Sequence, residues 1–416
     1  MKESAENLGR RLIVFDVEGV LIPRNRYLIF EVGRKLSPLK FIKLLMIGLL
    51  YELRLLTLEL TLKEVFKMFK GISTKEIFIT FKAIPLLPNV DILFTKLRKM
   101  GFKTAIISSG LPQILVEHLA SKLNIDYAFG LELELCNNVV TGNIKGEVIK
   151  KDGKALVMEK ILNQENLTYA NCVVVADDRN NSSIFHPYTL KIGYRPDSLI
   201  VRKSDHVITE NLLDIFPIIL GTEKKHHSLT RNEAVREIIH SIGFLAVPAS
   251  ILFGAIQVAL FLLLTIIFYI TAEFARIQWK TRSLFSYVTL KATTSSECHE
   301  FVATPIFLAL GVALSLLLFS PPTNYVSITI VTIGDSAASI FGRLFGKTSL
   351  PINKSKNLEG SIAGFTFAFI GATFFVNPLQ ALIAAIVGML IEATPIPIND
   401  NLSIPLGTGV LLTFLL

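Results

Sequence analysis

The feature that most constrains this 416-residue chain is the uneven distribution of its charged residues. Charges recur every few residues as far as about Arg236, whereas residues 238–274 and 301–416 contain long stretches with almost none. With 51% hydrophobic residues and a mean hydropathy of +0.53, the chain is too apolar for a purely soluble protein. We therefore expect a soluble domain at 1–222, a linker at 223–229 and a transmembrane domain at 230–416.

Charge and cysteine usage exclude several classes of protein. The formal net charge is +8, but no basic stripe is interleaved with aromatic residues, so we expect no nucleic-acid partner. Cys136, Cys172 and Cys298 are widely spaced, which indicates neither a disulfide framework nor a zinc site and favours a reducing cytoplasm. The first apolar run is interrupted by Asp16 and Glu18, so no signal peptide is expected.

Three apolar segments of the first half share one form, because each ends in acidic or hydroxyl side chains. They are residues 12–18 (LIVFDVE), 104–110 (TAIISSG) and 171–178 (NCVVVADD). Such segments are typical of buried parallel strands, and helical patterns lie between them. Groups at the carboxyl ends of parallel strands meet at one edge of the sheet. We therefore predict a doubly wound α/β domain with one active-site edge.

Phosphoryl transfer is the chemistry that these strand-end groups favour. Asp16 is placed to attack phosphorus and form an acyl-phosphate, provided that the charge of the substrate is neutralised. Glu18 lies on the same side of the extended chain and is placed to protonate the leaving alcohol. Asp177 can complete a Mg²⁺ site with oxygen ligands.

The motifs resemble the haloacid dehalogenase superfamily, and within it the phosphoserine-phosphatase-like members. The counterparts of its motifs are DVEGV at 16–20, a strand-end Ser108, Lys154 in a helical pattern, and ADDRNN at 176–181. The resemblance implies phosphate binding by Ser108 and Lys154, and Mg²⁺ binding by Asp16, Glu18 and Asp177. It also implies a phosphomonoester substrate.

Three departures from the family pattern bear on activity. Glu18 replaces the commoner Asp, Asp178 replaces a small glycine, and Asn181 stands where a second acid is expected. An amide can orient a metal-bound water but supplies no charge. We therefore expect a lower affinity for the metal.

The resemblance implies that residues 23–100 form a helical cap that selects the substrate. Segment 38–56 of this cap is unusually apolar, but its longest uncharged run, Leu44–Tyr51, is too short to span a bilayer. Two interpretations stay open. The segment is either a buried helical hairpin, or a cap that rests on the membrane surface or accepts a lipid tail.

The second half predicts about seven transmembrane helices. Residues 238–272 are too long for one span and are divided near Gly254. The other expected spans are Phe301–Phe319, Tyr325–Phe341, Ser361–Val376, Leu379–Glu392 and Ser403–Leu416. Basic residues concentrate in the loops after the second and fourth spans, at Arg276, Lys280, Arg282, Lys291, Arg343, Lys347, Lys354 and Lys356. This asymmetry predicts a multi-pass protein of the cell membrane, with these loops and the soluble domain in the cytoplasm.

The densest polar constellation of this half is GDSAASIFGRLFGK at 334–347 and NKSKNLEGS at 353–361. Small residues let backbones approach, Asp335 can hold Mg²⁺, and the basic group suits a polyphosphate. The candidate phosphate-binding residues are Arg343, Lys347, Lys356 and Glu359. The alternative is that the small residues pack helices and the basic ones only set topology.

This constellation resembles the membrane family of dolichol kinase, phytol kinase and CTP-dependent diacylglycerol kinase. The segment from Glu392 to Asn401 also matches, as do residues 236–240 and 273–276. The resemblance implies CTP as phosphate donor and an isoprenoid or related lipid alcohol as acceptor.

We therefore expect a bifunctional enzyme, in which a phosphatase is fused to a CTP-dependent lipid kinase. One alternative is a phosphatase that a non-catalytic lipid-binding domain anchors to the membrane. Another is a scaffold of two degenerate domains, which the cost of ionisable groups inside spans disfavours.

Overall fold

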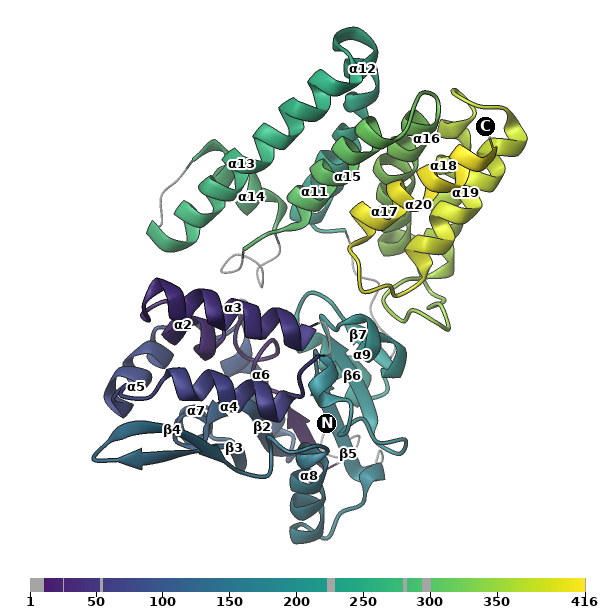
Figure 1. Ribbon diagram of the computed structural model, residues 1–416. Helices are drawn as coiled ribbons and strands as arrows, with labels where there is room; N and C mark the ends of the chain where they lie inside the picture. The colour runs from purple at the N-terminus through teal and green to yellow at the C-terminus, as the bar shows by residue number, and fades with distance from the viewer. Residues whose placement is uncertain are drawn as a thin grey trace. The chain divides into compact units, whose positions relative to one another are not determined.

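The computed structural model describes residues 11–24, 26–52, 55–222, 229–279, 283–293 and 301–415 (Figure 1). The chain separates into two compact units, Met1–Glu223 and Lys224–Leu416. Of the predicted linker, residues 223–228 lie outside the described residues, as do Lys280, Arg282 and Cys298. Each unit is therefore considered by itself.

One seven-stranded sheet forms the centre of the first unit, in the order β4-β3-β2-β1-β5-β6-β7. The strands are β1 (Leu12–Phe15), β2 (Lys103–Pro112), β3 (Tyr127–Cys136), β4 (Val139–Lys145), β5 (Cys172–Ala176), β6 (Leu190–Tyr194) and β7 (His206–Ile208). β1 pairs in parallel with β2 and with β5, and only the β3–β4 pairing is antiparallel. The residues of β1 and β5 are fully buried, as expected for parallel strands covered on both faces.

Helices cover this sheet on its two faces and close the predicted doubly wound domain. They are α6 (Val90–Lys99), α7 (Gln113–Leu123), α8 (Gly153–Gln164), α9 (Ser198–Lys203) and α10 (Ile215–Ile219). Short 3₁₀ turns lie at Tyr169–Asn171, Arg179–Asn181 and Leu212–Asp214. The ring of Phe94 on α6 packs 5.1 Å from that of Phe15 on β1. Helix α6 thus belongs to the core of the sheet, although it falls inside the range predicted for the cap.

Four helices form the cap itself: α2 (Leu28–Gly33), α3 (Pro38–Glu52), α4 (Leu58–Met68) and α5 (Thr74–Lys82). The hydroxyls of Thr57 and Ser73 cap the first turns of α4 and α5. Helix α3 has an exposed apolar face, on which Leu39 is 81% exposed and Met46 is 60% exposed. The interpretation of this segment as a buried hairpin is therefore wrong for that face.

The second unit is helical. Its helices are α11 (Arg231–Ile242), α12 (Ala246–Phe253), α13 (Ala255–Trp279), α14 (Leu284–Ala292), α15 (Thr304–Leu318), α16 (Thr323–Thr329), α17 (Asp335–Phe345), α18 (Leu358–Ala372), α19 (Pro378–Ala393) and α20 (Asp400–Leu415). A 3₁₀ turn at Gly243–Leu245 joins α11 to α12. The helix is interrupted at Gly254, whose φ is +93°, where the sequence predicts the end of the first span. Helix α14 has no counterpart among the expected spans.

Three helices among the described residues are long and apolar enough to cross a membrane: Arg231–Phe253, Ala255–Ile277 and Thr323–Phe345. The last is continuous because a π-helical segment, Ile330–Gly334, joins α16 to α17. Two thirds of its most apolar window is buried, against 11% for Ala255–Ile277. Thr323–Phe345 is therefore the central helix of the unit. The apolar helices α15, α18 and α19 are shorter.

Small residues bring the central helix close to α18. A Cβ atom at Gly364 would lie 2.9 Å from the Gly334 carbonyl oxygen and 2.8 Å from the Cβ of Ala338. A side chain at either glycine would push the two helices apart. This close contact fixes the position of Asp335, which directly follows Gly334.

Candidate active sites

The carboxyl ends of two adjacent parallel strands bring the acids of the soluble unit together. Asp16 directly follows β1, and Asp177 directly follows β5, which pairs with β1. Both carboxylates are buried. Gly19 permits this arrangement, because its φ is +84° and a Cβ atom there would lie 2.0 Å from Asp177 Oδ2.

Lys154 places a buried positive charge beside the proposed nucleophile. Its Nζ lies 3.1 Å from Asp16 Oδ1 and 2.7 Å from Asn181 Oδ1, which accepts a hydrogen bond from it. The amide of Asn181 in turn donates to Asp16 and to Asp178. Asn181 thus holds the lysine and two carboxylates in one buried network, in the position where the family has an acid.

Asp178 is the acid whose role the sequence did not reveal. The ligand oxygens of Asp16, Asp177 and Asp178 all lie within 4.8 Å of one another, and no other such group occurs in the described part of the chain. Burial and the neighbouring carboxylates raise the pKa of Asp178 to about 6 and that of Asp177 well above its usual range. A divalent cation would relieve this repulsion.

Asp177 supplies the test of whether a metal fits. Both of its carboxylate oxygens are buried without a hydrogen-bond partner among the described residues, and Arg24 Nε lies 3.5 Å from Oδ2. Buried carboxylate oxygens are normally hydrogen-bonded, so two orphaned ones indicate a missing ligand. The site therefore fits Mg²⁺, which takes oxygen ligands.

Glu18 stands apart from this acidic group. Its Oε1 is buried without a hydrogen-bond partner among the described residues, and a Cβ atom at Gly110 would lie 2.0 Å from its Oε2. Burial, followed by the charge of Asp16, raises the pKa of Glu18 to about 8. The carboxyl group therefore carries a proton at neutral pH, as a general acid requires.

Ser108 and the cap complete the soluble site. Ser108 is fully buried, and its Oγ accepts a hydrogen bond from the backbone N–H of Leu111 at 3.0 Å. On the cap side, the hydroxyl of Tyr51 donates to the side chain of Asn180, and Arg179 donates to the Tyr51 carbonyl oxygen at 2.7 Å. The end of α3 thus contacts the loop that carries the fourth motif.

In the helical unit, Lys356 is surrounded by three acids. Its Nζ bonds to Glu392 and lies 3.5 Å from Asp400 Oδ2 and 3.9 Å from Asp335 Oδ1. Burial lowers the pKa of Lys356, but the carboxylates of Glu392, Asp335 and Asp400 outweigh it and raise that pKa overall. The second oxygen of Glu392, Oε2, is buried and has no hydrogen-bond partner among the described residues.

His240 on α11 joins this acidic centre. Its Nε2 lies 2.6 Å from Asn401 Oδ1 and 3.8 Å from Asp335 Oδ2. Its Nδ1 lies 2.9 Å from the hydroxyl of Ser336. Because Asn401 Oδ1 only accepts, Nε2 carries the ring proton and Nδ1 accepts from Ser336.

The remaining predicted residues of this unit do not join the centre around Lys356. Arg343 forms a salt bridge with Glu233, and Lys347 is exposed. Glu359 accepts hydrogen bonds from the backbone N–H of Thr348, so it shapes the loop. The segment that holds Glu392, Asp400 and Asn401, and the segment of His240, match the kinase family in sequence, but that resemblance assigns these residues no roles.

The two units of the chain match two different protein families. The family profile of haloacid dehalogenase-like hydrolases matches residues 13–180, and that of the cytidylyltransferase family matches residues 233–399. These matches confirm the fusion that the motifs predict.

Individual relatives cover parts of the chain. A phosphoserine phosphatase of Archaeoglobus fulgidus is 28% identical over 52% of this chain and 62% of its own length. A phosphoserine phosphatase of Methanocaldococcus jannaschii is 26% identical over 47% of this chain and 90% of its own length. Phytol kinase 1 of Arabidopsis thaliana is 30% identical over 28% of this chain, which spans less than half (44%) of that protein. A solved structure of a phospho-aspartyl intermediate analogue of phosphoserine phosphatase has 25% sequence identity to this chain and a TM-score of 0.46. The match covers 51% of this chain and 99% of that one.

Proposed function

Because the chain joins a haloacid dehalogenase-like domain to a domain of the cytidylyltransferase family, we propose that it is a bifunctional membrane enzyme. The soluble unit hydrolyses a phosphomonoester through an aspartyl-phosphate. The helical unit transfers the γ-phosphate of CTP to an isoprenoid or related lipid alcohol. The proposal rests on two centres of buried charge, one in each unit.

The contact between Asp16 and Lys154 carries the phosphatase half of the proposal. An oxygen of Asp16 bonds to phosphorus as the ester bond breaks, and Glu18 gives its proton to the leaving alkoxide. Glu18 then takes a proton from the water that attacks this phosphorus. The bond to Asp16 breaks, and inorganic phosphate leaves. Lys154 and Ser108 hold the phosphate oxygens during both steps.

Asp16, Asp177 and Asp178 would hold Mg²⁺ in this unit, since their oxygens form a compact group with two orphaned atoms. When bound, the ion would neutralise charge on the phosphate and permit attack by a carboxylate. Glu18 lies outside this group, which favours its role as an acid over a role as a ligand.

The carboxylates around Lys356 carry the kinase half of the proposal. Mg²⁺ in nucleotide sites is held by one or two carboxylates together with substrate phosphates, and Asp335 with Glu392 offers such a pair. The alcohol oxygen bonds to the γ-phosphorus as its bond to the departing CDP breaks. The hydroxyl proton passes to Asp335, and Lys356 stabilises charge on the phosphates.

The arrangement in the membrane is part of the same proposal. Three helices have the length of a span, and α15, α18, α19 and α20 would complete seven. The basic loop residues favour a cytoplasmic position for the loop of Lys356 and for the soluble unit. Both centres would then meet cytosolic nucleotides and phosphoesters.

The position of the transferred label in CTP tests the kinase. Purified chain in lipid nanodiscs is given prenol, phytol or diacylglycerol with CTP labelled at the γ- or the α-phosphorus. Transfer of γ-label and release of CDP are expected. Transfer of α-label with pyrophosphate release would instead reveal a cytidylyltransferase, the activity that the family name describes.

The alternative is an anchored phosphatase, in which the helical unit binds lipid without chemistry. An Asp16→Asn variant separates the two halves, because it should lose phosphate release and keep lipid phosphorylation. Phosphate release by the unmodified chain, together with no transfer of either label by the Asp16→Asn variant, would establish the alternative.

A further inference from the structure

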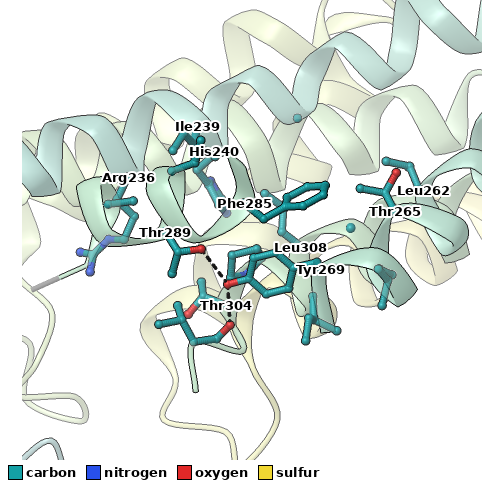
Figure 2. Close-up of a pocket in the computed structure, with 18 of the residues that line it drawn as sticks. Arg236, Ile239, His240, Leu262, Thr265, Tyr269, Phe285, Thr289, Thr304 and Leu308 are labelled. Carbon is teal, nitrogen blue, oxygen red and sulfur yellow. Dashed lines mark hydrogen bonds between the residues drawn. The ribbon is translucent and has the colours of Figure 1, made fainter. Parts of the chain in front are cut away.

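An apolar cavity of about 320 Å³ lies in the helical unit (Figure 2). Its walls come from α11, α13, α14 and α15. Leu262, Ile266, Leu308 and Val312 line it with hydrocarbon. Its volume falls within the range of sites that bind small organic ligands. Such a cavity binds a hydrophobic molecule rather than a nucleotide.

Arg236, His240, Tyr269 and Thr289 line one end of the cavity, and Thr265 lies at the other end beside Leu262 (Figure 2). The Tyr269 hydroxyl already donates to the Val302 carbonyl oxygen at 2.9 Å and accepts from Thr289 at 3.4 Å. These two side chains are therefore occupied with their own contacts, and they hold α13 against α14.

His240 belongs both to the cavity and to the acidic centre. It lines the cavity, and its Nε2 lies 3.8 Å from Asp335 Oδ2. Both ring nitrogens have hydrogen-bond partners in Ser336 and Asn401, so the ring is a positioning group rather than a base. A hydroxyl group at this end of the cavity would lie one side chain away from Asp335.

We propose that this cavity is the acceptor-lipid site: the hydrocarbon chain of the alcohol lies between α13 and α15, with its hydroxyl at His240. This inference rests on the proposed kinase function and adds where the acceptor binds. This placement would favour long apolar alcohols, because the walls offer burial to hydrocarbon. Asp335 then receives the hydroxyl proton as the phosphoryl group transfers.

Two substitutions on one helix provide the test. Leu262→Trp fills the cavity, whereas Leu260→Trp adds the same side chain two residues away, at a position that is 58% exposed and does not line it. Phosphorylation of geranylgeraniol, a long-chain prenol, is measured for both in nanodiscs. We expect Leu262→Trp to raise the KM for the prenol at least about tenfold without changing the KM for CTP. Leu260→Trp should stay within about twofold of the unmodified chain. Equal effects of both variants would overturn the assignment.

A labelling experiment separates failure of the cavity from failure of the kinase. A prenol that carries a photoreactive diazirine near its tail is crosslinked to the unmodified chain, and the labelled peptides are identified by mass spectrometry. Labelling of Leu262 on α13, or of the residues of α15 that line the cavity, supports the site even if no phosphate is transferred, provided that excess unlabelled prenol blocks it. Labelling spread over the outer face of α13, unaffected by competitor, would refute it.

The exposed face of α3 carries a second, independent inference. Leu39, Ile42, Met46 and Leu49 recur at helical spacing along this face, and all four are more than half exposed. Lys40 and Lys43 are exposed beside them. An apolar stripe flanked by lysines is the pattern of a helix that lies in the interface of an anionic membrane.

The connection between the units identifies the occupant of this face. The first candidate span begins at Arg231, eight residues after Glu223, which ends the soluble unit. Eight extended residues reach at most about 29 Å, so the soluble unit is tethered close to the bilayer at a high effective concentration. We infer that α3 inserts its apolar face into the surface of the bilayer that holds the helical unit.

Quenching by lipids measures this contact in the full chain. All three native cysteines are replaced by serine, and a bimane fluorophore is attached at Met46→Cys or, as the control, at exposed Lys122→Cys on α7. In vesicles with phosphatidylglycerol and doxyl-labelled lipid, we expect strong quenching at position 46 and little at 122. Equal quenching at the two positions would overturn the inference, including the case in which a second copy of the chain covers α3.

Discussion

Replacement of Gly19 by alanine tests the proposed metal site through geometry alone. A Cβ atom at this position would lie 2.0 Å from Asp177 Oδ2 and 2.5 Å from its Cγ. Asp177 is buried, so its carboxylate has to move away from Asp16 and Asp178. The positive φ of +84° adds strain of about 1–2 kcal/mol for a residue with a side chain.

Gly101→Ala provides the matched control. Its φ is +81°, and nothing lies within 4 Å of a Cβ atom there, so it shares the backbone strain without the steric contact. Without metal, Gly19→Ala should lose more stability than Gly101→Ala, because the steric contact adds to the shared strain. Only Gly19→Ala should bind Mg²⁺ more weakly, by at least about tenfold.

Calorimetry of the full chain measures thermal unfolding of the soluble unit, in which weaker Mg²⁺ binding appears as a smaller Mg²⁺-induced rise in Tm. Mg²⁺ at about 100 times its dissociation constant stabilises the folded state by about 2.7 kcal/mol. Tenfold weaker binding removes about 1.3 kcal/mol of this, or roughly 3–5 °C of the Mg²⁺-induced rise in Tm. An identical Mg²⁺-induced rise in both variants would refute the assignment of Asp177 as a ligand.

Substitutions at three further positions have expected outcomes. Lys154→Met leaves Asp16 without its buried cation, which costs about 3–5 kcal/mol; release of phosphate from p-nitrophenyl phosphate should fall at least a hundredfold, with lipid phosphorylation unchanged. Lys356→Met should abolish lipid phosphorylation and leave phosphate release unchanged, because it leaves three acids facing the nucleotide phosphates. A Lys356→Met variant that keeps full transfer would contradict the role of this lysine. Asn357 caps α18 through Gly360 N–H and donates to the Gly342 carbonyl oxygen at 2.9 Å. Thermal unfolding should therefore show that Asn357→Thr, which keeps the cap, costs about 1 kcal/mol less than Asn357→Ala.

The strand-end motifs predicted that Asp16 and Asp177 lie near each other, and the structure has them so because a parallel sheet brings the ends of adjacent strands together. No role for Asp178 could be predicted from the sequence, because its position corresponds to a glycine of the family motif. Only the turn Arg179–Asn181 shows that Asp178 lies against Asp16 and Asp177. Likewise, the bridging of Asp16 and Lys154 by Asn181 depends on contacts between distant segments, which motif spacing does not contain.

In the helical unit, apolar length and the break at Gly254 predicted most helices, but not which polar groups meet. Arg343 and Lys356 look equivalent in the sequence as basic residues near Asp335. The fold directs Arg343 to Glu233 and Lys356 to the acids of α19 and α20. Segment 38–56 was ambiguous for the same reason, because periodicity alone does not say whether an apolar face is covered.

Transfer of phosphate by the helical unit is the central claim, and the soluble unit could hide it by removing the phosphate from the product. The most direct measurement therefore uses an Asp16→Asn background in nanodiscs, with γ-labelled CTP and geranylgeraniol. We predict labelled prenyl phosphate in this background and its loss, by at least about a hundredfold, when Asp335→Asn is added. Absence of labelled lipid with every alcohol tried, or transfer that survives the loss of Asp335, would contradict the account.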